Sequence, residues 1–247
     1  MTTRTRPRLL DLYCGAGGAA MGYARAGFDV VGVDHRAQKN YPFEFHQGEA
    51  LAYLEEHGGE FDAIHASPPC QLFSAIRKGR WKERQHPDLV EPTRRGLRES
   101  GRPYIIENVV GAPLIEPVML CGTMFGLQTR AGAQLRRHRL FELSFPLDAL
   151  LWPCQHNRHA SAIGVYGGGQ HPQRRRVPST IGVYGHSGGS TRRDYLDFTS
   201  FLTSDRREAM GIDWMTNSEL SQAIPPAYTE FLGAWLLRHL SAILPPA

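Results

Sequence analysis

Hydrophobic residues near the start of the chain fall into short runs that are separated by glycine-rich or polar segments. Residues 7–34 predict a strand, a glycine-rich turn, a short helix and a second strand that ends at Asp34, which together form a βαβ unit. Further apolar runs predict strands at 61–67 and 102–109, and helical spacing at 86–100 predicts a helix between them. This alternation predicts an α/β fold with a doubly wound, mostly parallel sheet.

The hydrophobic pattern changes in the second half of the chain. Residues 145–201 are rich in Gly, Pro, Arg and His and contain only short β-like pieces, whereas helical spacing returns after them. The pentapeptide Ile-Gly-Val-Tyr-Gly occurs at 163–167 and again at 181–185, which predicts two similar short strands. We therefore expect a small β-rich insert. The predicted boundaries are 1–144 for the first part of the main domain, 145–203 for the insert and 204–247 for the return to the main domain.

Two apolar runs near the ends of the chain are interrupted by polar residues. Asp11 breaks the first run, and the last one contains Arg238 and His239, so we expect neither a signal peptide nor a membrane span. The four cysteines are widely spaced, which favours free thiols over a disulfide framework. We expect a soluble, monomeric protein of the cytoplasm.

Positive charge is concentrated in one segment of the chain. The net charge is only +4, but residues 128–193 contain ten Arg and two acidic residues. The remaining residues are acidic in balance. A basic segment on a mildly acidic body favours a polyanionic partner, although a solvated basic loop region has the same composition.

Three candidate functional segments each follow a predicted strand. They are the glycine-rich turn after the first strand, Cys70 within Ser-Pro-Pro-Cys, and Glu107 within Glu-Asn-Val. Because ligands of doubly wound sheets bind beyond the carboxyl ends of the strands, we expect the three segments to converge on one edge of the sheet.

Together, the stretches DLYCGAGG, SPPCQLFS, ENV and RRHRLFE resemble the motifs of DNA (cytosine-5)-methyltransferases in order and spacing, and AIPPAYTEFLG resembles the final motif of that family. The resemblance covers roughly 1–142 and 205–240, and compact members from bacteriophage genomes are the most similar, so the host cytoplasm is the expected location if a phage encodes the chain. It implies a Rossmann-like fold that binds S-adenosylmethionine, and methylation of a cytosine flipped out of duplex DNA. Residues 145–203 would then recognise the target.

The resemblance also assigns catalytic roles. Cys70 would add to carbon 6 of cytosine, and the two prolines before it would hold the sulfur in place; the alternative is a buried cysteine that acts as a small hydrophobic residue. Glu107 would hydrogen-bond the N3 and amino edge of the base, the alternative being a surface acid at a strand end. Asn108 would brace the Pro-Pro-Cys loop. Arg137 and Arg139 would contact the cytosine and its phosphate and favour the thiolate, or would simply face DNA.

Cofactor and DNA contacts follow from the same resemblance. The glycine turn would approach S-adenosylmethionine, Tyr13 would stack near the adenine, and Asp34 would bind the ribose. Glu49 would contact the adenine amino group, or it is only an acid at a helix start. The predicted cofactor-binding residues are Tyr13, Gly15, Gly17, Gly18, Asp34, Glu49, Pro69 and Gln222. The predicted DNA-binding residues are Arg174, Arg175, Arg176, Arg192 and Arg193.

Two positions depart from the family pattern. Leu135 stands where a Gln precedes the two arginines, unless Gln134 replaces it with a shift of one residue. Gln222 stands where the family has Asn before the Pro-Pro turn, and its amide would lie one methylene further from the backbone. We expect Gln222 still to contact the methionine end of the cofactor.

Three alternatives concern the substrate, turnover and metal binding. One branch of the family acts on transfer RNA, and a relative without turnover would only bind DNA. A zinc set is conceivable in the Cys-Gln-His-Asn-Arg-His stretch, but its spacing matches no zinc template, and we expect a polar loop and no metal. The residues of that conceivable set are Cys154, His156, His159 and His171.

Overall fold

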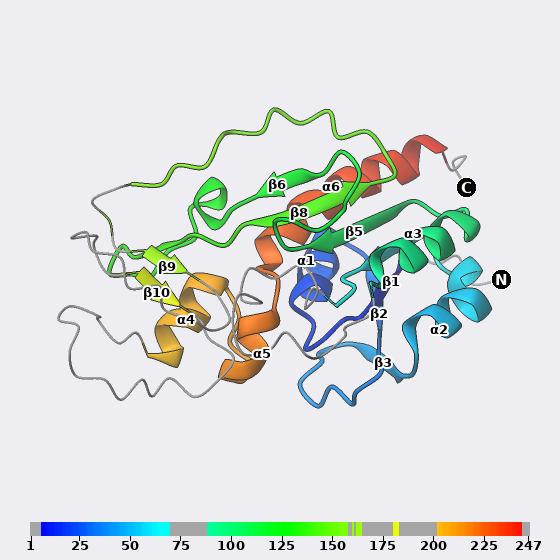
Figure 1. Cartoon of the computed structure of the whole chain (residues 1–247), viewed down its shortest axis with the longest axis horizontal. Coiled ribbons are helices and arrows are strands. Elements are labelled where there is room, and N and C mark those ends of the chain that lie inside the picture. The colour runs from blue at the N-terminus through cyan, green and yellow to red at the C-terminus, as the bar shows by residue number, and fades with distance from the viewer. Residues whose placement is uncertain are drawn as a thin grey trace.

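The computed structural model describes residues 6–69, 88–157, 160, 162–164, 180–182 and 202–243. A seven-stranded sheet with helices on both faces forms its centre (Figure 1). The strands are β1 (Arg8–Leu12), β2 (Asp29–Asp34), β3 (Glu44–Gln47), β4 (Ala63–Ala66), β5 (Tyr104–Asn108), β6 (Val118–Leu120) and β8 (Arg139–Leu143). The helices are α1 (Gly18–Ala26), α2 (Ala50–His57), α3 (Val90–Glu99), α4 (Thr203–Met210), α5 (Asn217–Gln222) and α6 (Pro226–Ile243), with short 3₁₀ turns η1 (Gly58–Glu60) and η3 (Gly122–Phe125).

The strand order is β3-β2-β1-β4-β5-β8-β6. The first five strands in this order pair in parallel, whereas β8 runs antiparallel to both β5 and β6. The chain moves outward from β1 to β2 and β3, and then returns to the other side of β1 with β4. This confirms the predicted doubly wound, mostly parallel α/β fold.

Alternate residues of the central strands serve two separate cores. Leu9 of β1 packs with α1 and α6 on one face, while Leu10 and Leu12 pack with α2 and α3 on the other. This alternation follows from the two-residue period of a strand, and hydrophobic side chains on both faces are typical of a parallel sheet covered by helices. α6 is tied to α1 by the Thr229 hydroxyl, which donates to the Ala19 carbonyl over 2.8 Å. Among the described residues, no helix has the length and apolar character needed to cross a membrane.

A second, three-stranded sheet contains the first two residues of each copy of the repeated pentapeptide. Its order is β10-β9-β7, with β7 (Gln134–Leu135), β9 (Ala162–Gly164) and β10 (Thr180–Gly182). β9 and β10 pair in parallel, so that Ile163 of the first copy lies opposite Ile181 of the second. The prediction of two similar short strands is therefore confirmed. β9 also pairs with β7, which comes before the predicted insert, so this small sheet begins on the main domain.

A buried ion pair fixes β8 against α3. The Arg94 guanidinium donates to both carboxylate oxygens of Glu142, over 2.8 and 2.7 Å, and the Ile115 N–H donates to the same carboxylate over 2.8 Å. Both side chains of the pair are 4% exposed. Water therefore cannot replace either partner if the other is removed.

Replacing Glu142 with alanine should lower the free energy of unfolding by about 3 kcal/mol, because the buried guanidinium of Arg94 would keep only its ion pair with the exposed carboxylate of Glu91. Chemical denaturation monitored by circular dichroism measures this loss. Glu99→Ala, at an exposed position of α3, is the matched control and should change the stability by less than about 0.5 kcal/mol. A loss below about 1 kcal/mol in Glu142→Ala would show that the pair contributes little.

Candidate active site

The candidate site lies where the winding of the sheet reverses. β1 is flanked by β2 on one side and β4 on the other, so the carboxyl ends of these strands meet at the switch point where such sheets bind ligands. The Ser67 N–H donates to the Leu12 carbonyl over 3.1 Å, which joins the segment after β4 to the end of β1. The glycine turn, the Ser-Pro-Pro segment and Glu107 are therefore close together, as the sequence predicts.

The glycine turn after β1 is compact for two reasons. Gly17 has φ 83°, in the left-handed region where a side chain would be strained. At Gly18 a Cβ atom would lie 2.5 Å from the Ile224 carbonyl oxygen, so only glycine allows the turn to pack against the segment before α6. Tyr13 also has a positive φ, 57°, and its hydroxyl lies 3.0 Å from that of Thr93. The backbone of the turn is thus held from both sides.

Asp34 ends β2 beside this turn. Its carboxylate accepts from the Gly15 N–H over 3.1 Å and from the Arg36 N–H over 3.0 Å, and the residue is 8% exposed. Glu49 is exposed and begins α2, but its side chain caps no backbone N–H of that helix. The structure thus places Glu49 at a helix start, as the alternative has it, and its contact with the adenine amino group stays a prediction.

Asp11 is a buried acid that the sequence analysis gave no role. It is fully buried in β1, and neither carboxyl oxygen makes a hydrogen bond of normal geometry among the described residues, although the Tyr41 hydroxyl is near enough to lower the Asp11 pKa. Burial raises its pKa well above the ordinary range, and the nearby charges of Asp34 and Glu107 raise it further. A buried polar group without such a hydrogen bond is uncommon in folded proteins, and it marks this place as one where a further group can bind.

The Ser-Pro-Pro segment is fixed by two buried side chains. The Asn108 amide donates to the Pro68 carbonyl over 3.0 Å, which is the contact expected of a residue that braces this loop. His65 of β4 is fully buried, and its ring nitrogens lie 2.9 Å from the Tyr23 hydroxyl and 2.9 Å from the Ser67 hydroxyl. Burial lowers the pKa of His65 to about 3, so the ring is neutral at physiological pH. Cys70 itself lies outside the described residues.

Glu107 and Arg139 form an ion pair at the end of β5. Arg139 Nε lies 2.9 Å from Glu107 Oε1, and the two side chains are 13% and 8% exposed. Burial raises the pKa of Glu107, although Arg139, Arg137 and a hydrogen bond from Ser67 act in the opposite direction. A carboxyl with a raised pKa in a dry place can share a proton with a bound base.

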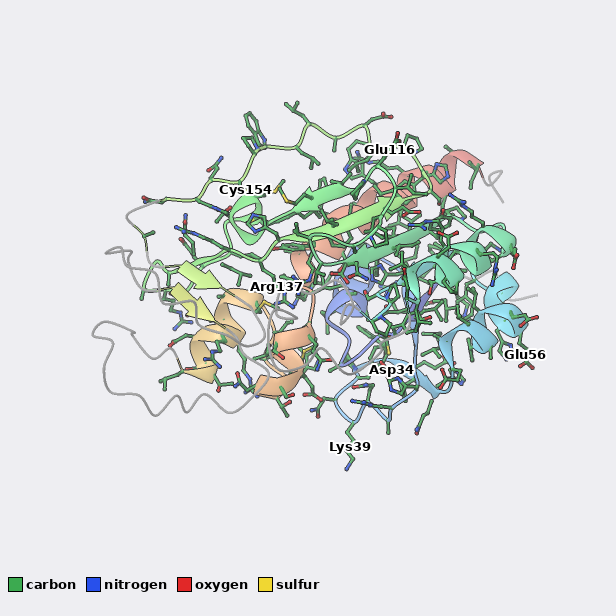
Figure 2. All side chains as sticks on the ribbon, viewed as in Figure 1. Asp34, Lys39, Glu56, Glu116, Arg137 and Cys154 are labelled. Carbon is green, nitrogen blue, oxygen red and sulfur yellow. The ribbon has the colours of Figure 1, made fainter. Side chains whose placement is uncertain are left out.

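Arg137 has a different environment from Arg139. It is 1% exposed, and its Nη2 donates to the Ser221 carbonyl over 3.0 Å (Figure 2). Its own carbonyl accepts from the Tyr228 hydroxyl over 2.5 Å. Arg137 therefore ties the segment between β7 and β8 to α5 and α6, while Arg139 pairs with the acid of the site. The expected contact of both arginines with a cytosine stays a prediction.

Gln222 is the last residue of α5 and is exposed. The next two residues, Ala223 and Ile224, pack directly on Gly18 of the glycine turn. This places Gln222 one residue from the segment that contacts the predicted cofactor site.

Replacing Gln222 with alanine should weaken S-adenosylmethionine binding by about 1 kcal/mol, or about fivefold in Kd, the scale of one hydrogen bond. Calorimetric titration of the cofactor into both proteins measures the change. Ser218→Ala, at an exposed position of the same helix, is the control and should bind as the wild type does. An unchanged Kd in Gln222→Ala would show that its side chain points to solvent.

Several predicted residues lie outside the described part of the chain. They are Cys70, Arg174, Arg175, Arg176, Arg192 and Arg193, together with His159 and His171 of the conceivable zinc set. Pro69, the last described residue of its segment, follows the Pro68 carbonyl that Asn108 holds.

Comparisons with known proteins agree with this geometry. Residues 7–112 match the model of the C-5 cytosine-specific DNA methylase family. The type II methyltransferase M.AgeI of Thalassovita gelatinovora is 31% identical over 122 residues, a match that covers 42% of this chain and 28% of that protein.

Two solved structures share the fold over nearly their whole length. The S. pombe Dnmt2 methyltransferase has a TM-score of 0.60 at 13% identity, and the match covers 96% of this chain and 100% of that one. A DNA modification methyltransferase encoded within an E. coli prophage has a TM-score of 0.53 at 14% identity, with 95% and 99% covered.

The fold is the Rossmann-like, mostly parallel α/β fold that these two methyltransferase structures also have. The matched residues 7–112 include the glycine turn, the Ser-Pro-Pro-Cys stretch and Glu107, so this part of the chain is similar to the C-5 cytosine-specific DNA methylase family at each of these motifs.

Proposed function

We propose that this chain transfers a methyl group from S-adenosylmethionine to carbon 5 of cytosine in duplex DNA. One observation supports the proposal: Asn108 holds the Pro68 carbonyl, two residues before Cys70 in the sequence, at the end of β5, where Glu107 is buried and paired with Arg139. A nucleophile on that loop and a proton-sharing acid are the two groups that methylation of this unreactive carbon requires.

The residues after β1 and β2 fit the cofactor. S-adenosylmethionine carries a positive sulfonium and a positive amino group, and the acids Asp11, Asp34 and Glu107 are grouped at this end of the sheet. Burial favours the neutral form of the Asp11 carboxyl, and a cationic group bound beside it would favour the carboxylate. At Gly15 an added Cβ would meet no atom within 4 Å, so the backbone of the turn is open to a ligand at that position. When bound, the cofactor supplies an electrophilic methyl group.

Side chains of the protein would activate the cytosine ring. The Cys70 thiolate adds to carbon 6 and forms an S–C bond, while the electrons of the 5,6 double bond shift toward carbon 5 and the N3 edge. Glu107 stabilises that edge by a hydrogen bond or a proton, and Arg139 holds the Glu107 carboxyl in place. After carbon 5 has taken the methyl group, loss of its proton restores the double bond and expels the thiolate. The cytosine must leave the duplex for both carbons to be reached.

Transfer of labelled methyl groups tests this function. Duplex DNA of mixed sequence and transfer RNA are offered separately and in competition, and methylated nucleosides are identified after digestion. We expect 5-methyldeoxycytidine from the DNA. Labelling of RNA alone would assign the chain to the other substrate class, and absence of transfer to either one, with the cofactor bound, would contradict the proposal.

The arginines of the predicted insert should hold the DNA backbone. Replacing Arg174, Arg175 and Arg176 with alanine should weaken DNA binding and reduce the slope of log K against log salt by about 0.9 for each phosphate that the protein no longer binds. Fluorescence anisotropy over a salt series measures the slope. The same slope in the wild type and the variant would mean that this run of arginines does not touch DNA.

A further inference from the structure

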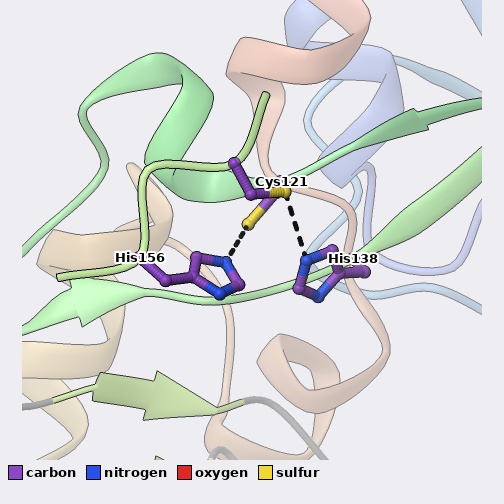
Figure 3. A group of neighbouring side chains, drawn as sticks. Cys121, His138 and His156 are labelled. Atoms are coloured by element: carbon purple, nitrogen blue, oxygen red, sulfur yellow. Dashed lines mark hydrogen bonds between the residues drawn. The ribbon is translucent and has the colours of Figure 1, made fainter. Parts of the chain in front are cut away.

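Two cysteines and two histidines converge beside the second sheet (Figure 3). Cys121 follows β6, His138 lies between β7 and β8, and Cys154 and His156 belong to the segment after β8. Their ligand atoms all lie within 4.8 Å of one another. Three separate segments of the chain thus contribute two sulfur and two nitrogen atoms to one place.

The distances are close to those of a tetrahedral metal site. Cys121 Sγ lies 3.3 Å from His156 Nε2, and Cys154 Sγ lies 3.4 Å from His138 Nε2. Tetrahedral zinc with ordinary Zn–S and Zn–N bonds places sulfur and nitrogen ligands about 3.5 Å apart and two sulfurs about 3.8 Å apart. The side chains would need only small movements to enclose an ion. The rings of His138 and His156 are inclined at 70° with centroids 5.1 Å apart, so they do not stack against each other.

Hydrogen bonds between side chains and backbone already hold the ligand segments together. The Gln134 amide donates to the Gln155 carbonyl over 3.3 Å, and its oxygen accepts from the Asn157 N–H over 3.0 Å. The Gln155 N–H donates to the Thr123 hydroxyl over 3.2 Å, and that hydroxyl also lies 3.4 Å from Cys121 Sγ. Cys154 and His156 are therefore fixed opposite Cys121 by contacts of their neighbours, and no ligand has to be recruited from a distant part of the chain.

We propose that Cys121, His138, Cys154 and His156 bind one zinc ion. Two thiolates and two imidazoles form a set that suits zinc and disfavours magnesium or calcium, which prefer oxygen ligands. Four protein ligands leave no open position, so the ion has a structural role. The proposal does not depend on the methyltransferase activity.

The thiols are suited to metal binding. Burial raises the pKa of Cys121, but hydrogen bonds with His138, Thr123 and His156 outweigh this effect and lower it to about 6. Burial and the adjacent charge of Cys121 raise the pKa of Cys154 to about 11. A divalent cation between the two sulfurs would remove this repulsion, because both could then be thiolates.

The site would connect the target-reading part of the chain to the candidate active site. His138 lies between Arg137 and Arg139, and Arg139 forms the ion pair with Glu107. Cys154 and His156 lie within the predicted insert, whereas Cys121 is in the main domain. An ion bound here would fix the start of the predicted insert and hold the segment from Arg137 to Arg139.

Metal content of the tag-free protein, purified without chelators, tests the proposal. Inductively coupled plasma mass spectrometry should find about one zinc per chain. Cys154→Ser and His156→Asn should reduce it to background. Both residues are outside the buried core, and circular dichroism checks that these variants remain folded. His46→Asn, an exposed histidine of β3, is the matched control and should keep the metal. Cobalt in place of zinc should give the absorption of a tetrahedral thiolate site.

Other results would overturn the proposal. These are a folded wild type without metal, zinc that all the variants retain, and cobalt spectra without thiolate charge-transfer bands. Intact-mass analysis adds a further check, because a mass lower by two hydrogens, with Cys121 and Cys154 in one cross-linked peptide, would show a disulfide in place of the metal.

Discussion

Replacing Cys70 with serine should abolish methyl transfer, with a loss of at least about 10³-fold, the scale on which removal of a nucleophile acts. A hydroxyl at neutral pH is a far weaker nucleophile than a thiolate, so the addition to carbon 6 would fail. Binding of S-adenosylmethionine and of DNA should remain, because the glycine turn, Asp34 and the bracing contact of Asn108 with Pro68 do not involve the sulfur. Initial rates with labelled cofactor, together with the two binding constants, measure these effects.

Cys14→Ser is not a suitable control, since Cys14 belongs to the glycine turn itself. Glu99→Gln, at an exposed position of α3, should leave the rate unchanged. Activity above about one tenth of the wild type in Cys70→Ser, with the protein folded, would exclude a covalent mechanism through this residue.

Replacing Glu107 with glutamine should slow methyl transfer by about 10²–10⁴-fold, the usual contribution of a positioned acid or base. Glutamine keeps the shape and can still hydrogen-bond, but it cannot share a proton with the base. The buried Arg139 would also lose the charge with which it pairs at 2.9 Å, so thermal unfolding must be measured alongside activity.

The loss should be found in kcat, with the Kd for S-adenosylmethionine nearly unchanged. Single-turnover rates at saturating cofactor separate the chemical step from binding. A variant that is folded, binds the cofactor and methylates at the wild-type rate would show that Glu107 serves only to pair with Arg139.

The pattern of hydrophobic residues was sufficient to predict the centre of the fold. Short apolar runs on both sides of the glycine turn predicted the parallel strands. The glycine turn, the Ser-Pro-Pro segment and Glu107 each lie at the carboxyl end of one of these strands. The contact of Asn108 with Pro68 also follows the prediction, because strand order alone brings the ends of β4 and β5 together. Local sequence determines these features, so they can be read without the tertiary structure.

Features that depend on distant segments were not predicted. The four residues of the proposed zinc site come from three segments of the chain. Of these four, the conceivable zinc set in the sequence analysis contained only Cys154 and His156, together with His159 and His171. Cys121 and His138 lie far from them along the chain, and no spacing template connects the four. The buried Asp11 and the buried His65 were missed because each is an ordinary polar residue in an apolar strand until the packing around it is known.

Trapping with 5-fluorocytosine tests the central claim most directly. A duplex library with 5-fluorocytosine in place of cytosine is incubated with the wild type and with Cys70→Ser, in the presence and absence of S-adenosylmethionine. Carbon 5 then carries fluorine where a proton must leave, so elimination cannot follow methyl transfer. We predict a denaturant-resistant complex that needs the cofactor, is absent in Cys70→Ser, and maps to the Cys70 peptide by mass spectrometry. If the wild type binds cofactor and DNA but forms no such complex, or forms it through another residue, the proposed reaction is contradicted.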